Sequence, residues 1–121
     1  MAIGSGCVRQ AAALPIRGER VCLVLSRRGK RWVIPKGCIE RGQTAGETAL
    51  QESWEEAGLI GVLSRQPVGS YRYRKCGQTY LVTVFLMAVT DAAKEWPEEH
   101  RRNRGWVNAG RAVEHITNRG L

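Results

Sequence analysis

Residues 37 to 59 read GCIERGQTAGETALQESWEEAGL, and this stretch decides the fold because it joins a glycine loop to a capped helix. Thr44 can cap the helix start, and Glu47 three residues later completes an S/T-x-x-E capping box. Gly58 supplies the stop, since a glycine just past the last turn adopts the left-handed conformation at little cost. The pattern predicts a helix of about four turns that begins near Thr44.

Three glutamates of this helix, Glu52, Glu55 and Glu56, are spaced i, i+3 and i+4. At roughly 100° per residue they fall within about 100° of one another, so three carboxylates share one face. We expect the nearly opposite face to pack on the core; its members are Gly46, Leu50, Ser53, Trp54 and Ala57.

Like charges at this spacing destabilise a helix unless a cation lies among them. Mg²⁺ takes oxygen ligands and is commonly held by one or two carboxylates together with the phosphate oxygens of a substrate. On the helix alone, a solvated acidic face is the simpler interpretation. The preceding glycine loop favours the metal site.

With this loop, the stretch resembles the Nudix box, G-x5-E-x7-R-E-U-x-E-E-x-G-U, where U is a bulky apolar residue. The agreeing positions are Gly37, Glu52, Glu55, Glu56, Gly58 and Leu59. Gln43 stands in place of the Glu, Gln51 in place of the Arg, and Ser53 in place of an apolar residue. The flanking WVIPKG is also typical of the family. The chain is most similar to the small diphosphoinositol polyphosphate and diadenosine polyphosphate hydrolase branch.

The resemblance implies an α+β protein with the Nudix fold, a mixed β-sheet sandwiched between helices (an α/β/α sandwich), as one domain over residues 1–121. It also implies a hydrolase that cleaves pyrophosphate bonds of nucleoside diphosphate-X substrates, here diadenosine polyphosphates or inositol pyrophosphates, with Mg²⁺ or Mn²⁺. The expected metal ligands are Gly37, through its carbonyl, and Glu52, Glu55 and Glu56. The three glutamates are also the expected catalytic residues, with Glu52 alternatively the general base.

Basic side chains would bind the substrate phosphates. The resemblance, together with the position of Lys36 before the loop, indicates Arg9, Arg17, Arg27, Arg31, Lys36, Arg72, Arg102 and Arg104. For Lys36, a phosphate ligand and a solvated lysine beside a turn both remain open. Alternation along a strand sends Arg72 to one face and Tyr71 and Tyr73 to the other, so these side chains cannot all line one pocket.

Gln43 and Gln51 replace what is usually an oppositely charged pair that braces the loop against the helix. Both members are changed together, and two amides can hydrogen bond because each offers a donor and an acceptor. We therefore expect the two side chains to meet and the metal ligands to stay in place.

The composition sets limits on partners and location. The chain has 121 residues, which suits one domain, and a net charge of +8, which favours an anionic small-molecule substrate. No apolar run approaches the roughly 20 residues that span a bilayer, and no signal-peptide layout is present, so we expect a cytoplasmic protein without a membrane partner. The four cysteines lack zinc-ligand spacing and are expected to be reduced. The oligomeric state stays open.

Runs of strand-forming residues predict the rest of the sheet, namely Cys7 to Ile16, Glu19 to Ser26, Trp32 to Ile34, Leu59 to Leu63, Val68 to Arg74, Tyr80 to Val89 and Gly105 to Asn108. We expect turns at Arg17-Gly18 and Cys76-Gly77, an edge strand at Leu59 to Leu63, and a central strand buried on both faces at Tyr80 to Val89. A second helix is predicted over Ala109 to Asn118.

Two other functions remain open. Because Gln43 and Gln51 depart from the box, the chain is alternatively a catalytically weak Nudix-fold module that binds nucleotides or RNA ends. An RNA 5′-pyrophosphohydrolase is favoured by the positive charge alone, so a nucleic-acid partner is possible but not favoured.

Overall fold

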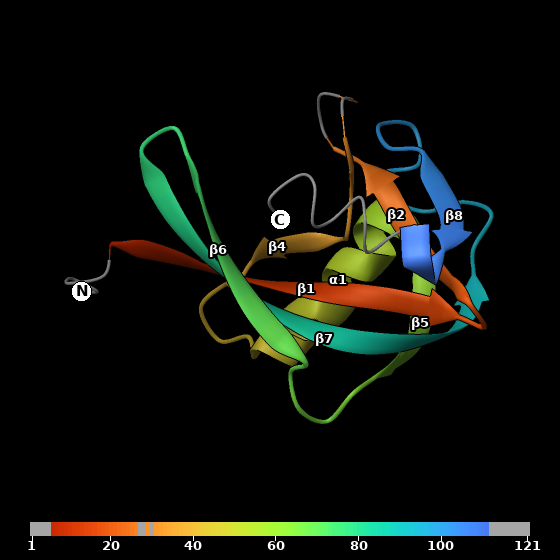
Figure 1. Ribbon diagram of the computed structural model, residues 1–121, viewed down its shortest axis with the longest axis horizontal. Helices are drawn as coiled ribbons and strands as arrows, with labels where there is room; N and C mark the ends of the chain where they lie inside the picture. The colour runs from red at the N-terminus through yellow and green to blue at the C-terminus, as the bar shows by residue number, and fades with distance from the viewer. Residues whose placement is uncertain (1–5, 27–28, 30, 112–121) are drawn as a thin grey trace.

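The computed structural model describes residues 6–26, 29 and 31–111, in which an eight-stranded mixed sheet packs against helix α1 (Figure 1). The strands are β1 (Cys7–Arg17), β2 (Arg20–Leu25), β3 (Trp32–Val33), β4 (Lys36–Cys38), β5 (Leu59–Leu63), β6 (Gly69–Lys75), β7 (Gln78–Ala92) and β8 (Arg104–Asn108), and the helix is α1 (Ala45–Ala57). The α+β class is confirmed, and every predicted strand is present. The short strand β4 was not predicted.

β1 and β7 form the centre of the sheet. They run parallel from the pair Cys7 and Thr79 to the pair Ile16 and Ala88. The other edge of β7 pairs with β6 along its first half and with β5 along its second, both antiparallel. The other edge of β1 pairs first with β4 and then with β2. β5 pairs only with β7 in this sheet, so its prediction as an edge strand is confirmed.

The prediction that β7 is buried on both faces is wrong for its second half. Phe85, Met87 and Val89 are buried with α1 in one core cluster, whereas Leu86 between them is 37% exposed. Helix α1 covers one face of the sheet here and leaves the Leu86 face open to solvent. A continuous apolar run therefore does not by itself distinguish one-sided from two-sided burial.

Helix α1 begins and ends as predicted. The Thr44 hydroxyl accepts a hydrogen bond from the Glu47 backbone amide, and the Glu47 carboxylate accepts one from the Thr44 amide. At the other end Gly58 has φ of 66°, the left-handed conformation that a glycine adopts without strain.

The predicted apolar face of α1 is partly wrong. Leu50 and Trp54 are 39% and 37% exposed, whereas Glu56 is only 4% exposed. Small residues take part in the packing of the helix on the sheet: Ala49 and Ala57 of α1 and Ala11 and Ala13 of β1 are fully buried in one core cluster, which also holds Phe85 and Met87 of β7. This seam of small side chains brings the helix close to the sheet, so that the bulkier Leu50 and Trp54 lie at its margin and an acidic residue turns inward.

The predicted helix Ala109 to Asn118 is helical over 109–111, and the rest of it lies outside the described residues. No helix in the described part of the chain is long and apolar enough to cross a membrane. Cys22, Cys38 and Cys76 are free thiols.

Candidate active site

The Glu52 carboxylate lies directly over Gly37. β4 places Gly37 opposite Ala11 of β1, beneath the helix. A side-chain carbon added at Gly37 would lie 2.7 Å from Glu52 Oε2 and 2.8 Å from Glu52 Cγ, which is closer than such atoms approach. Gly37 is therefore needed for the close approach of a carboxylate, and Glu52 and the Gly37 backbone are brought together as the sequence predicts.

Glu56 is buried beside Glu52 and accepts a hydrogen bond from the backbone of β4. Its Oε1 accepts a hydrogen bond of 3.3 Å from the Lys36 amide. The Glu52 and Glu56 carboxyls lie within hydrogen-bonding reach of each other. Burial, together with this shared contact, raises the pKa of Glu56 well above its usual range, and burial raises the pKa of Glu52 as well. Taking carboxylates out of water is unfavourable unless a positive charge lies close to them.

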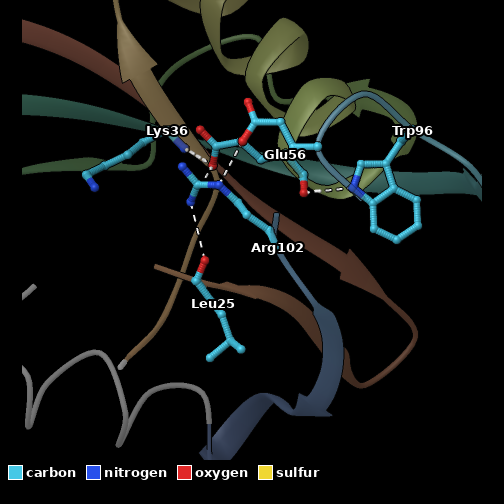
Figure 2. A network of polar contacts seen from close by, with 6 residues as sticks. Leu25, Lys36, Glu56, Trp96 and Arg102 are labelled. Carbon is cyan, nitrogen blue, oxygen red and sulfur yellow. Dashed lines mark hydrogen bonds and ion pairs between the residues drawn. The ribbon is translucent and has the colours of Figure 1, made fainter. Parts of the chain in front are cut away.

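Arg102 supplies part of this positive charge. Its side chain, only 11% exposed, lies 3.7 Å from Glu56 Oε1 (Figure 2). The same side chain forms a 2.8 Å ion pair with Glu98. It also donates a hydrogen bond to the carbonyl oxygen of Leu25. Arg102, predicted as a substrate ligand, is thus placed at the carboxylates and already held by them.

Sequence reasoning missed Glu98. Its carboxylate is bound to Arg102, its charge raises the pKa of both Glu52 and Glu56, and its backbone amide donates to the carbonyl oxygen of Glu55. Glu98 stands in a polar loop with no periodic pattern, so no local signal marks it. The aromatic residue Trp96 nearby was the available sign that this loop packs on the protein.

The loop from 93 to 103, with Arg104 at its end, holds the C-terminal end of α1. The indole of Trp96 packs on Gly58, where a side-chain carbon would lie 2.9 Å from the ring, and its Nε1 donates to the carbonyl oxygen of Glu56. Arg104 lies over the Trp96 ring at 4.1 Å and donates to the carbonyl oxygens of Ala57 and Ala93. Arg104 is therefore engaged as a cap of the helix end and not as a free arginine for substrate.

The loop before α1 is joined to the helix by side-chain amides. Gln43 Nε2 donates to Gln51 Oε1 over 2.6 Å, so the expectation that these two side chains meet is confirmed. Gln51 Nε2 in turn donates to Glu55 Oε2 over 2.8 Å. The Glu55 carboxylate is therefore held on the exposed side of the helix by Gln51.

Lys36 presents its backbone and its side chain to opposite sides of β4. Figure 2 shows the side chain extending away from Glu56, and its Nζ lies 5.3 Å from the centre of the Tyr73 ring. Burial lowers the pKa of Lys36, and the positive charges of Lys75 and Arg31 act in the same direction. Lys36 and Arg31 thus lie near Tyr73, on the face of the sheet away from the carboxylates, which neither interpretation of Lys36 from the sequence predicts.

Arg9 and Arg72 lie on the carboxylate face. Both are paired with Leu81, Arg9 from β1 and Arg72 from β6, so they flank it on one face about 10 Å apart. Arg9 shares this face with Ala11, two residues along β1 and directly opposite Gly37. We call Arg9 and Arg72 the basic pair. Arg9 lies about 7 Å along β1 from Ala11, the residue opposite Gly37.

Arg17 is not brought to this site. It lies six residues beyond Ala11 on β1, about 20 Å along the strand, with its guanidinium over the Trp106 ring. Its place at the far end of a long strand follows from the hairpin with β2. Arg27 lies outside the described residues.

The donor set fits a hard divalent cation in part. Glu52 and Glu56 offer carboxylate oxygen atoms at one place above Gly37, the ligand type that Mg²⁺ and Mn²⁺ prefer. Among the described residues, however, no three His, Cys, Asp or Glu side chains converge closely enough to hold a metal. Glu55 is turned toward Gln51, so the structure groups two of the three predicted carboxylates.

Comparisons with known proteins bear on the family to which the chain belongs. Residues 8–119 match the NUDIX domain family. The chain is 33% identical over 116 residues to Nudix hydrolase 17, mitochondrial, of Arabidopsis thaliana, covering 90% of this chain and 63% of the relative. It is 30% identical over 115 residues to human diphosphoinositol polyphosphate phosphohydrolase 3-beta, covering 90% and 69%. Several plant relatives are matched over only about half of their length, between 46% and 57%.

Solved structures share the fold. A C. elegans Ap4A hydrolase superposes with a TM-score of 0.75 at 19% identity, covering 92% of this chain and 87% of that one. A NUDIX hydrolase from Nitrosomonas europaea gives a TM-score of 0.77 at 20% identity, covering 92% and 78%. The Gly37, Glu52 and Glu56 arrangement, the family match over nearly the whole chain and the shared fold lead to one conclusion: this chain belongs to the Nudix family.

Proposed function

We propose that this chain is a divalent-metal-dependent pyrophosphohydrolase whose preferred substrates are polyphosphates, such as diadenosine polyphosphates or inositol pyrophosphates. The observation that carries the proposal is the pairing of half-buried Glu52, which packs on Gly37, with buried Glu56, which lies next to Arg102. Two carboxylates whose pKa values are raised by burial are stabilised by a divalent cation more than by water. When bound, such a cation would neutralise phosphate charge and activate a water molecule.

The residues of the chain have separable roles in this proposal. Glu52, Glu56 and the Gly37 carbonyl would hold the cation, with Mg²⁺ or Mn²⁺ as the expected choice, and Glu55 would take part from its place beside them. The Lys36 amide fixes Glu56, and Arg102 and Glu98 close the site on the other side. Attack of water on phosphorus would then break one P–O bond of the anhydride and release two phosphorylated products.

The basic pair supports a substrate with several phosphates. Arg9 and Arg72 lie on the same face as the carboxylates, and both side chains are exposed. A diphosphate bound at Glu52 and Glu56 would not extend to both arginines, whereas a longer polyphosphate would. The similarity to a human diphosphoinositol polyphosphate phosphohydrolase is in line with this preference. We keep the cytoplasmic location as a prediction, since some relatives are named as mitochondrial or chloroplastic.

The test of hydrolysis is phosphate release from diadenosine polyphosphates, inositol pyrophosphates and nucleotide sugars, with Mg²⁺, with Mn²⁺ and in EDTA. We expect turnover that requires the cation and falls more than about 100-fold in Glu56→Gln, because loss of an outer partner of a metal already costs 10–100-fold. Glu19→Gln, the same change in an exposed turn, is the control. Unchanged turnover in Glu56→Gln, or full activity in EDTA, would contradict the proposal; nucleotide binding without turnover would favour the binding module.

The test of substrate length is charge reversal of the basic pair. Arg72→Glu should raise KM for a long polyphosphate and flatten its dependence on salt, because exposed charges are screened over about 10 Å at 0.1 M salt and about 3 Å at 1 M. KM for a nucleotide sugar should change little. Arg65→Glu, in the exposed loop between β5 and β6, is the matched control. Equal effects of both variants would make a short substrate the better assignment.

A further inference from the structure

Three hydrogen bonds connect the loop before α1 to Glu55. The Thr48 hydroxyl donates to Gln43 Oε1 over 3.1 Å, Gln43 Nε2 donates to Gln51 Oε1, and Gln51 Nε2 donates to Glu55 Oε2. The series of hydrogen bonds starts at Thr48, which is only 1% exposed, and ends at Glu55. We call these four residues the amide relay.

The direction of the amide relay is fixed by Glu55. An ionised carboxylate only accepts hydrogen bonds, so Gln51 must turn its NH₂ group toward Glu55 and its oxygen toward Gln43. Gln43 must then turn its own NH₂ toward Gln51 and its oxygen toward Thr48. The buried Thr48 hydroxyl is the donor that satisfies this last oxygen. If either glutamine were reversed, two oxygen atoms would face each other.

We propose that Thr48, Gln43 and Gln51 are positioning residues that hold the Glu55 carboxylate through this one-way relay. The inference rests on the proposed function, because Glu55 is taken to act on the cation or its water. It goes beyond the idea that two amides replace an ion pair. The relay predicts that Gln51→Arg is tolerated on its own, whereas Gln43→Glu is tolerated only when Gln51 is already an arginine.

The difference between the two single changes follows from donors and acceptors. Gln43→Glu alone places an acceptor-only group opposite the Gln51 oxygen, so Gln51 must turn its NH₂ to the new carboxylate and present an oxygen to Glu55. Gln51→Arg alone keeps a donor on Glu55, and Gln43 can reverse because the Thr48 hydroxyl also accepts. With both changes, the arginine donates to the two carboxylates at once.

The test measures Mn²⁺ affinity by titration calorimetry and turnover of the best substrate for wild type, the two single variants and the double variant. We expect Gln43→Glu to weaken Mn²⁺ binding and kcat by about 10-fold or more, the cost of losing an outer partner. Gln51→Arg and the double variant should stay within about 3-fold of wild type. Coulomb attraction alone predicts tighter Mn²⁺ binding in Gln43→Glu, so the sign separates the relay from a simple charge effect.

Two further variants complete the experiment. Gln51→Met keeps the length of the side chain but removes the donor, and it should weaken Mn²⁺ binding as Gln43→Glu does. Gln66→Glu repeats the charge change in an exposed loop and should have no effect. Thermal melts of every variant would check that each one is folded.

The outcomes are distinguishable. Wild-type affinity and turnover in Gln43→Glu, or equal losses in Gln43→Glu and Gln51→Arg, would overturn the relay. Absence of turnover in the wild-type protein would overturn the proposed function, while the Mn²⁺ affinities would still decide the relay.

Discussion

The two ends of helix α1 are fixed by different means. At the N-terminal end, residues close in sequence form a capping box and the amide relay, and most of these groups face solvent. At the C-terminal end, Trp96, Glu98 and Arg104 come from a loop about 40 residues away and bind the helix backbone directly. The first end is specified by local spacing, whereas the second depends on the completed sheet. Changes at the second end should therefore cost more stability, and changes between the ends should cost more function.

Among the changes that test this contrast, the largest effect is expected for Gly37→Ala in β4, which acts on Glu52 between the two ends of the helix. The added carbon would overlap the Glu52 carboxylate, and a displacement of about 1 Å at a reacting group can cost about 100-fold in rate. Turnover and Mn²⁺ affinity should both fall by that order. Gly69→Ala, at a glycine with open space around it, is the control. Normal turnover in Gly37→Ala would show that Glu52 can act from another position.

The next effect tests the C-terminal end through stability. Arg104→Met keeps the apolar stem but removes both hydrogen bonds to the carbonyl oxygens of Ala57 and Ala93. We expect a loss of about 2 to 3 kcal/mol, because bonds from a charged donor contribute about 1.5 to 3 kcal/mol each and are not additive. Urea unfolding monitored by circular dichroism measures it. Gln51→Met at the other end should lose no more than about 0.5 kcal/mol; equal losses would remove the contrast between the ends.

The smallest effect concerns pH. The folded pKa values of Glu52 and Glu56 are raised, so the folded protein binds more protons than the unfolded one above the ordinary carboxyl pKa of about 4.3. The metal-free protein should lose stability as pH rises from about 5 to 8. Melting temperatures across this range should fall, Glu56→Gln should reduce the fall, and Mg²⁺ should oppose it. A flat profile in the wild-type protein would show that Glu56 is not buried in solution.

The sequence predicted what depends on local spacing. The helix with its cap at Thr44 and stop at Gly58, the strand positions, and the meeting of Gln43 and Gln51 all follow from residues within a few turns of each other. The place of Glu98 and the engagement of Arg104 were out of reach, because both depend on how a distant loop folds back on α1.

The eight predicted phosphate ligands illustrate the same limit. Strand alternation correctly separated Arg72 from the tyrosines, but it could not show that Arg9 would join Arg72 across β7. Nor could it show that the side chain of Lys36 would turn away while its amide bound Glu56. Strand register is a property of pairing, and it becomes known only when the partner strands are known.

The small residues between α1 and β1 have a consequence for how such a site can change. Ala49 and Ala57 of α1 share a core cluster with Ala11 and Ala13 of β1, and each of these four fully buried side chains is a methyl group. Because a helix moves as a rigid rod, one larger residue in the seam would lift Glu52, Glu55 and Glu56 together and leave their mutual spacing intact. The thickness of this seam therefore sets the distance between the carboxylates and β4, and substitutions there would adjust the depth of the site without replacing any residue that lines it.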